Sequence, residues 1–220
     1  MDDRTIIVTG AAGGIGSAIV SLLADSGDQI IGIDLPGRVC AKASTLIPLD
    51  FNEFCKSDQY RQEAITNIKN ILKPTCKKLV LVNNAAEQIL APAENLTSRD
   101  WDAVLTVNTL APFLLSQGLL SILEDTSGHI LNIASIHSKL TKPGFTAYAT
   151  SKAALEGLTK SLAVEWGARG IQINAISPAA IATPMLLSGF GGDEEGYAEL
   201  RSYHPSKTIG SPTDIALLIN

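Results

Sequence analysis

The chain begins with Met1-Asp-Asp-Arg-Thr-Ile-Ile-Val-Thr-Gly-Ala-Ala-Gly-Gly-Ile-Gly16. Residues 5–9 form a short apolar run that leads into a glycine-rich turn, and apolar residues then recur at helical spacing from Ile15 to Leu23. This order of strand, glycine-rich loop and helix is typical of a unit that binds phosphate groups.

Each glycine has a physical role in such a unit. Gly10 permits a tight turn, Gly14 lets the backbone approach a pyrophosphate, and Gly16 allows the helix to pack closely on the sheet. The helix N-terminus then presents free N–H groups and the positive end of its dipole to phosphates. A glycine-rich turn can also be merely a turn, but this one belongs to a unit that ends with Asp34. The pattern therefore favours dinucleotide binding.

Short β-rich runs alternate with longer helical segments throughout the chain. Such alternation predicts an α/β fold, doubly wound in three layers, in which helices cover a parallel sheet. Right-handed crossovers place the carboxyl ends of all strands at one edge, where ligands bind. The predicted strands are residues 5–9, 29–33, 46–49, 78–83, 129–134 and 171–176. The candidate residues that follow them are Gly10, Asp34, Asp50, Asn83, Ser135 and Ser177.

Asp34 ends the second predicted strand, where an acidic residue reaches the hydroxyls of the adenosine ribose. A carboxylate there accepts hydrogen bonds from the 2′- and 3′-hydroxyls but repels a 2′-phosphate, so we expect NAD in preference to NADP. The alternative uses Arg38 as a phosphate clamp. It is disfavoured because Asp34 stays in the way, and Ala11 and Ala12 supply no basic group.

Tyr148 and Lys152 are spaced so that they share one face of a helix, with Cβ atoms about 5–6 Å apart. A cation near a phenol favours the phenolate and lowers a pKa that is about 10 when unperturbed. Such a tyrosine exchanges protons near neutral pH. The pair alone is weak evidence, because helices often carry aromatic residues beside lysines, and its weight comes from the other motifs of the chain.

Together these motifs resemble the short-chain dehydrogenase/reductase family from residue 5 to about residue 215. The family's Thr-Gly-x-x-x-Gly-x-Gly signature reads here as Thr9, Gly10, Gly14 and Gly16, although Gly10, Gly13 and Gly16 also satisfy the spacing of longer, epimerase-type relatives. Three further matches favour the shorter branch with its Tyr-x-x-x-Lys pair. They are Asn83-Asn84-Ala85-Ala86, which is similar to Asn-Asn-Ala-Gly, the Ser151-Lys152 pair, and Asn108.

The resemblance implies hydride transfer between a nicotinamide and a secondary alcohol or ketone. Tyr148 would be the general acid or base, and Lys152 would lower its pKa and hold the nicotinamide ribose. Ser135 would bind the substrate oxygen, and Asn108 would hold a water that links Lys152 to solvent. The cofactor residues implied are Gly10, Gly14, Ile15, Gly16, Asp34, Asp50, Asn84, Ala85, Tyr148, Lys152, Pro178, Ile181 and Thr183.

Two departures from the family pattern and one glycine-containing segment affect the details of the predicted site. Ala86 and Ala179 replace glycines of the family pattern, which carries a strain cost if either position requires a positive φ. Residues 185–207 contain several glycines and little periodicity, and we expect a mobile lid over the substrate. The other pocket candidates are His137, Phe145, Ala180 and Met185, and a packing role for His137 is equally compatible with the sequence.

Composition predicts one domain that spans residues 1–220, because 45% hydrophobic and 18% charged residues are ordinary for a globular chain of this length. A net charge of −5 argues against nucleic-acid and anionic-membrane partners and favours a small molecule. Cys40, Cys55 and Cys76 form no disulfide or metal motif. The acidic start lacks the features of a secretory signal, so we expect a cytoplasmic protein.

Residues 103–123 contain no charged residue, and their length would suit a membrane span. Asn108, Pro112 and Gly118 interrupt the run, which predicts a buried helix instead. In the family the matching helix packs against a partner subunit, which implies a homodimer or homotetramer.

The family's last strand and its Gly-Gly segment have no counterpart before Asn220. If the protein ends at Asn220, the sixth strand is expected to keep an unpaired edge, and the alternative is that the sequence is an incomplete record. This leaves a nucleotide-binding pseudoenzyme or interaction protein as the alternative function. An epimerase or dehydratase is disfavoured by chain length and by the Asn-Asn-Ala-Ala motif.

Overall fold

The computed structural model describes residues 4–219. Its strands form one parallel sheet in the order β3-β2-β1-β4-β5-β6. The strands are β1 Arg4–Thr9, β2 Gln29–Asp34, β3 Thr45–Pro48, β4 Lys78–Asn83, β5 His129–Ile133 and β6 Gln172–Ile176. The strand order reverses between β1 and β4, which confirms the doubly wound fold expected from the sequence. Within the described residues β6 pairs with β5 alone.

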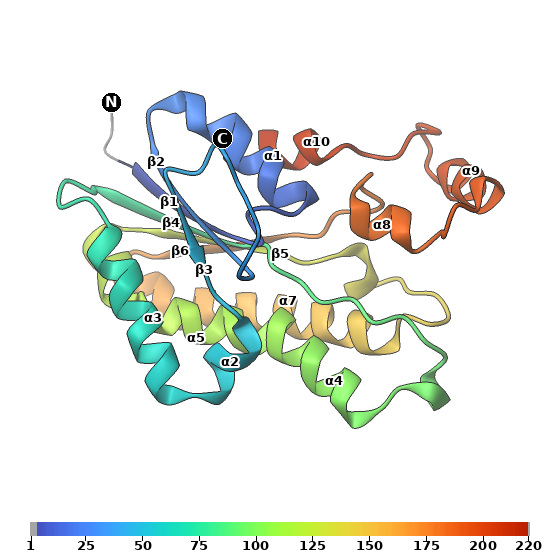
Figure 1. Cartoon of the computed structure of the whole chain (residues 1–220), viewed down its shortest axis with the longest axis horizontal. Helices are drawn as coiled ribbons and strands as arrows, with labels where there is room; N and C mark the ends of the chain where they lie inside the picture. Colours follow the sequence, from blue (N-terminus) through green and yellow to red (C-terminus); the bar gives the residue numbers. More distant parts are fainter. Residues whose placement is uncertain (1–3, 220) are drawn as a thin grey trace.

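Helices cover both faces of this sheet. Helices α1 and α10 lie on one face, and α3, α5 and α7 lie on the other (Figure 1). The main helices are α1 Gly14–Leu23, α2 Phe51–Lys56, α3 Asp58–Ile71, α4 Ser98–Leu105, α5 Ala111–Gly118, α6 Leu120–Asp125, α7 Thr146–Trp166, α8 Pro184–Ser188, α9 Glu194–Tyr203 and α10 Pro212–Leu217.

The sheet separates two hydrophobic cores. Ile6 and Val8 of β1 pack with α1 residues such as Ile19, whereas Ile7 packs on the other face with residues such as Leu115 of α5. This division follows from the pleat, because successive side chains of a strand point to opposite faces. Both faces of β1 are buried, as expected for a central parallel strand.

Residues 103–123, predicted as one buried helix, are helical with one buried side, but the helix is divided. The segment is divided into α4, a π-helical turn at Thr106–Leu110, α5 and α6, and Leu119 leaves the helical conformation with φ −98° and ψ 1°. One side of it is also exposed, with Leu110 at 42%. Asn108 lies in the π-helical turn, and its side chain bonds to Glu87 and Ser151 in neighbouring segments. None of the helices in residues 4–219 has the length and hydropathy that a membrane span needs.

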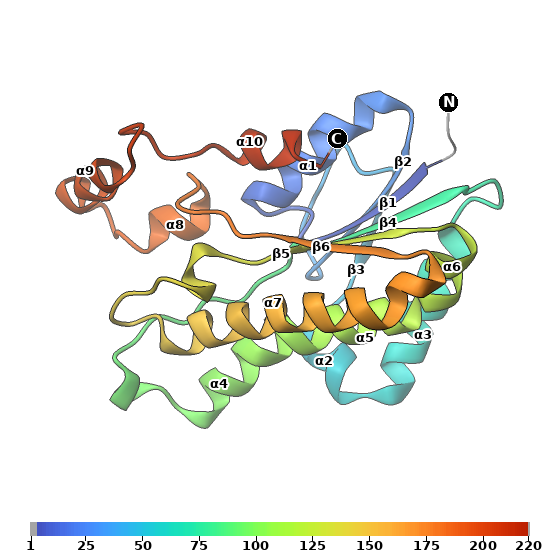
Figure 2. The same ribbon diagram turned by 180° about the vertical axis from the view of Figure 1, so that it is seen from behind.

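The segment expected to form a lid contains more regular structure than its sequence indicated. Thr183 caps α8 by accepting from the Leu186 N–H at 3.2 Å, and Asp193 caps α9 by accepting from the Gly196 N–H at 3.0 Å. These caps stabilise two short helices in a segment whose glycines interrupt the helical spacing of apolar residues. Neither helix has a buried residue, and both lie beyond the end of the sheet (Figures 1 and 2).

Two glycines of the chain are predicted to respond oppositely to alanine. A Cβ at Gly16 would lie 2.0 Å from the Gly10 carbonyl oxygen, whereas a Cβ at Gly157 in α7 would meet nothing within 4 Å. We expect Gly16→Ala to lower the free energy of unfolding by about 1–3 kcal/mol through overpacking. Gly157→Ala should raise it by about 0.5–1 kcal/mol. Urea unfolding measures both, and a Gly16→Ala variant as stable as the wild type would contradict the packing described here.

Candidate active site

The glycine-rich loop between β1 and α1 leaves no room for a side chain at Gly10 or Gly14. Gly10 has a φ of +64°, and its Cβ would lie 2.9 Å from the Cα of Ala85, so only glycine fits without strain. A Cβ at Gly14 would lie 2.8 Å from the Thr183 side chain. Helix α1 has no side-chain cap and no acidic residue in its first turn. Its N-terminus therefore has the chemistry that suits a phosphate.

Thr9 joins the glycine-rich loop to the segment that follows β4. Its hydroxyl oxygen accepts from the N–H groups of Asn84 and Ala85, each at 2.9 Å. The Asn84 amide in turn donates to the carbonyls of Thr9 at 2.9 Å and of Gly10 at 3.2 Å. These bonds fix the loops on both sides of the switch in strand order relative to each other.

Asp34 lies at the end of β2, beside the glycine-rich loop. Its Oδ2 accepts from the Ala12 N–H at 2.7 Å, and its Oδ1 accepts from the Leu35 N–H at 2.8 Å. A carboxylate has about four lone-pair sites, so both oxygens retain capacity for ribose hydroxyls. Asp50 caps α2 through the Asn52 N–H at 2.8 Å and lies at the end of the next strand, β3.

Helix α7 brings Tyr148 and Lys152 to the end of β5, where Ser135 follows the strand. The residues are 8%, 2% and 7% exposed, respectively, so burial governs their charges. The Lys152 ammonium donates to the Ile133 carbonyl at 2.8 Å and lies 5.7 Å from the centre of the Tyr148 ring. The sequence therefore identified side chains that the fold does bring together.

The expected lowering of the Tyr148 pKa is not found. Burial raises this pKa because it disfavours the phenolate, and a hydrogen bond with Ser135 acts in the opposite direction. Burial also lowers the pKa of Lys152 to about 8. Lys152 therefore loses its proton more readily than an exposed lysine does. Once neutral, it no longer stabilises a phenolate at Tyr148.

Asn108 joins three segments through its side chain. Its Oδ1 accepts from the Glu87 N–H at 2.7 Å, and its amide donates to the Glu87 carbonyl and to the Ser151 hydroxyl, each at 2.9 Å. Ser151 donates to the Tyr148 carbonyl at 2.7 Å. Both amide hydrogens are thereby committed to protein acceptors, so the water-holding role implied by the resemblance does not belong to the amide N–H groups.

Aromatic rings line the approach to Tyr148. His137 stacks on Phe145 with ring centres 4.2 Å apart, and each lies 6.2 Å from the Tyr148 ring, edge to face. Among the described residues, the Nδ1 of His137 is buried without a hydrogen-bond partner. Burial lowers the pKa of His137, with the Lys142 ammonium acting in the same direction. The imidazole beside Tyr148 is therefore neutral at neutral pH.

The segment after β6 contacts the other loops at the carboxyl edge of the sheet. The Pro178 carbonyl accepts from the Ile136 N–H at 2.8 Å, and Ile181 forms a parallel bridge with Gly210. Thr183 then lies against Gly14, so this segment reaches the glycine-rich loop. Neither Ala86 nor Ala179 has a positive φ, and the two replacements therefore carry no left-handed strain.

Sequence reasoning missed the contacts of Glu156. Its carboxylate accepts from Ser138 and Ser177, one turn beyond Lys152 on α7. The only signal was the spacing of Tyr148, Lys152 and Glu156, which repeats every four residues and keeps them near one helix face.

Comparison with known proteins agrees with this geometry. Residues 10–219 match the family model described as enoyl-(acyl carrier protein) reductase. The chain is 32% identical over 220 residues to D-threitol dehydrogenase of Mycolicibacterium smegmatis, covering 98% of this chain and 84% of that protein. It is 31% identical to an uncharacterised short-chain type dehydrogenase/reductase of Sinorhizobium fredii, covering 98% of this chain but only 40% of that protein.

A solved structure has the same fold over the whole chain. It is assigned as an NAD(P)-dependent gluconate 5-dehydrogenase of Beutenbergia cavernae and holds NADP at low occupancy. It matches with a TM-score of 0.87 and 30% identity over 100% of this chain and 89% of that chain. The fold and its loop define a nucleotide-binding α/β protein. The chain belongs to the short-chain dehydrogenase/reductase family, a family of oxidoreductases.

Lys152 is predicted to make stability depend on pH in the alkaline range. Its pKa is about 8 in the folded protein and about 10.4 when unperturbed. Between these values the unfolded chain holds the proton and the folded protein does not, so this contribution to stability rises with pH across the window. Lys152→Met removes the buried charge and should stabilise the protein at pH 7 by on the order of 1–3 kcal/mol, less the lost hydrogen bond.

Urea unfolding at pH 7 and pH 9.5 tests this prediction. The advantage of Lys152→Met over the wild type should shrink at the higher pH, whereas Lys160→Met, an exposed change on the same helix, should show no such trend. Identical pH dependence in the wild type and Lys152→Met would show that the folded protein does not shift the lysine.

Proposed function

We propose that this protein is an NAD-dependent short-chain dehydrogenase or ketoreductase that interconverts a secondary alcohol and a ketone. The observation that carries the proposal is the meeting of Tyr148, Lys152 and Ser135 at the edge that also holds the glycine-rich loop. A nicotinamide cofactor, when bound there, supplies or accepts the hydride.

The side chains of this edge then handle the proton and the substrate oxygen. The Tyr148 hydroxyl gives a proton to a carbonyl oxygen or takes one from an alcohol, and the Ser135 hydroxyl holds that oxygen by a hydrogen bond. The pKa shift of Tyr148 upward keeps the phenol protonated at neutral pH, which suits the reductive direction. After Tyr148 has given up its proton, the Lys152 ammonium, with a pKa of about 8, supplies a proton to the Tyr148 oxygen.

Asp34 supports the choice of NAD. Its carboxylate adjoins the Ala12 N–H at the position expected for the adenosine ribose, where a 2′-phosphate would meet a negative charge. The Beutenbergia cavernae structure holds NADP. The proposal for this chain rests on its own acidic residue and not on that relative.

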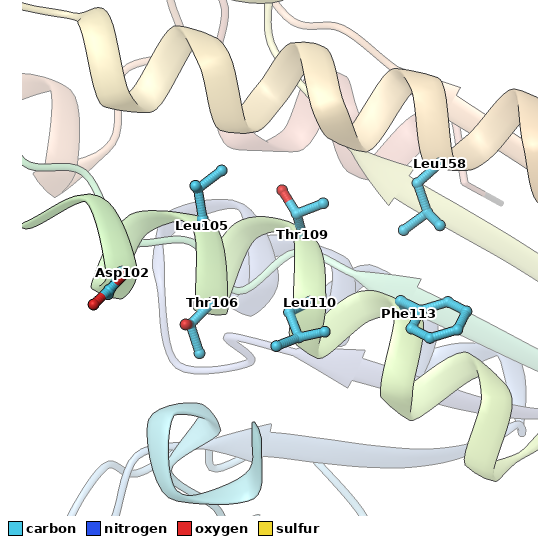
Figure 3. A pocket seen from close by; sticks show the side chains of 7 residues that line it. All are labelled: Asp102, Leu105, Thr106, Thr109, Leu110, Phe113 and Leu158. Atoms are coloured by element: carbon cyan, nitrogen blue, oxygen red, sulfur yellow. The ribbon is translucent and has the colours of Figure 1, made fainter. Parts of the chain in front are cut away.

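The remaining parts of the proposal concern substrate and assembly. Residues 185–207 form the lid, and His137 with Phe145 forms the pocket wall beside Tyr148. A second copy of the chain packs on the groove that side chains of α4, the π-helical turn, α5 and α7 line (Figure 3). Its lining residues are Asp102, Leu105, Thr106, Thr109, Leu110, Phe113 and Leu158. The mostly apolar lining suits a homodimer or homotetramer.

Tyr148→Phe is predicted to abolish turnover almost completely and to leave cofactor affinity nearly unchanged. The variant loses only the hydroxyl that transfers the proton, and the expected fall in kcat is about a hundred- to ten-thousand-fold. Tyr60→Phe, on α3 away from this edge, is the matched control and should retain full activity. An alcohol and ketone screen with NAD and NADH provides the assay. Substantial residual activity in Tyr148→Phe would remove this residue from the mechanism.

Cofactor preference is tested by titrating the protein with NADH and NADPH and following cofactor fluorescence or heat. We expect NADH to bind at least about tenfold more tightly, which corresponds to about 1.4 kcal/mol. Asp34→Asn removes the charge and should bring the two affinities closer, whereas Asp25→Asn, with a side chain 83% exposed, should change neither. Tighter binding of NADPH by the wild type would refute the proposed preference.

A further inference from the structure

Glu156 extends the line of functional residues on α7. It lies one turn beyond Lys152 and two turns beyond Tyr148, so the three side chains point to neighbouring parts of the same sheet edge. Tyr148 and Lys152 are buried there, whereas Glu156 lies at the solvent boundary. Its position allows it to contact the loops that pass over the helix.

Two serines from different loops donate to the same oxygen of Glu156. Ser138 Oγ and Ser177 Oγ each lie 2.5 Å from Oε1. Ser138 Oγ also lies 2.7 Å from the Ser135 carbonyl oxygen, which is a second possible acceptor for its proton. A hydroxyl has one proton, and the carboxylate is the stronger acceptor for it. Glu156 therefore binds the loop after β5 through Ser138 and the loop after β6 through Ser177, and holds both loops against α7.

Both loops carry parts of the candidate active site. Ser138 ends the 3₁₀ turn Ile136–Ser138, which Ser135 begins by accepting from the His137 N–H at 3.2 Å. Ser177 precedes Pro178, whose carbonyl accepts from the Ile136 N–H at 2.8 Å. The loops are thus joined to each other by the backbone and to the helix of Tyr148 by Glu156.

The charge of Glu156 suits this arrangement. Hydrogen bonds from Ser138 and Ser177 hold the pKa of the carboxyl below its usual range, and the Lys139 and Lys160 ammonium groups act in the same direction. The carboxylate is therefore ionised at neutral pH, and hydrogen bonds to an ionised acceptor are stronger than those between neutral groups.

We propose that Glu156 is a positioning residue, which sets the place of Ser135 and of the Pro178 segment relative to Tyr148 through the hydroxyls of Ser138 and Ser177. This inference rests on the proposed function, because the distances it fixes are those between the substrate oxygen, the proton-transfer residue and the cofactor. Glu156 touches none of the reacting atoms. Its removal should change turnover more than cofactor affinity.

The variants separate this role from a general effect on folding. Glu156→Ala removes the acceptor, whereas Glu156→Gln keeps one oxygen in the same place. The double variant Ser138→Ala with Ser177→Ala removes both donors and leaves the carboxylate. Glu165→Ala is the matched control, because it removes an exposed glutamate of the same helix far from these loops.

The first readout is amide hydrogen exchange of the free protein over residues 134–140 and 176–180. Exchange there should become several-fold faster in Glu156→Ala and in the serine double variant, and should stay at the wild-type rate in Glu165→Ala. This readout requires no turnover. Unchanged exchange in Glu156→Ala would overturn the proposal, whatever reaction the protein catalyses.

The second readout is steady-state turnover with the substrate found in the screen. Because small misplacements of reacting groups are costly, we expect kcat to fall about tenfold or more in Glu156→Ala and by less than about threefold in Glu156→Gln. The dissociation constant for NADH should stay constant. Adding Glu156→Ala to the serine double variant should cause no further loss of kcat, because the double variant already lacks both hydrogen bonds to Glu156.

Two outcomes separate the two proposals. Full kcat in Glu156→Ala, in a protein that turns over normally, would overturn the positioning role alone. Faster exchange in Glu156→Ala, in a protein that binds NADH but oxidises and reduces nothing in the screen, would support the link between the loops and overturn the proposed reaction.

Discussion

The buried ammonium of Lys152 fixes how α7 lies on the sheet. A charge in a protein interior is stable only when polar groups surround it, and here the Ile133 carbonyl at the end of β5 accepts its hydrogen bond. Any shift of the helix would leave the lysine without that partner. The places of Tyr148, Ser151 and Glu156, which α7 carries, follow from this one constraint.

Around this helix, side chains of helices and strands hold the loops of the site in place by hydrogen bonds. Asn108 ties the segment after β4 to α7, Thr9 ties the same segment to the glycine-rich loop, and Glu156 ties the loops after β5 and β6 to α7. Most of these bonds join residues distant in sequence. The edge is therefore built by tertiary contacts, and each loop depends on its neighbours for its conformation.

The sequence predicted the architecture well because its strongest signals are local. Short β-rich runs and the strand, loop and helix around Gly10 depend on neighbouring residues, so the six strands could be predicted. The meeting of Tyr148 and Lys152 with Ser135 was expected from the family resemblance and from the position of Ser135 at a strand end. The division of residues 103–123 could not, because the π-helical turn at Thr106–Leu110 and the break at Leu119 leave no local signal in the sequence. The pKa of Tyr148 likewise depends on burial by distant segments, and spacing along a helix does not reveal it.

The strand order also constrains how the chain folds. Strand β1 pairs on one side with β4, and the register joins Arg4 to Lys78 across a long intervening segment. Closing so long a loop costs entropy before the pair gains any stabilisation, and parallel pairings of this kind form slowly. The bonds between Thr9 and Asn84 span the same separation. The loop that suits a phosphate is thus completed only after the central strands have met, although its own sequence lies at the start of the chain.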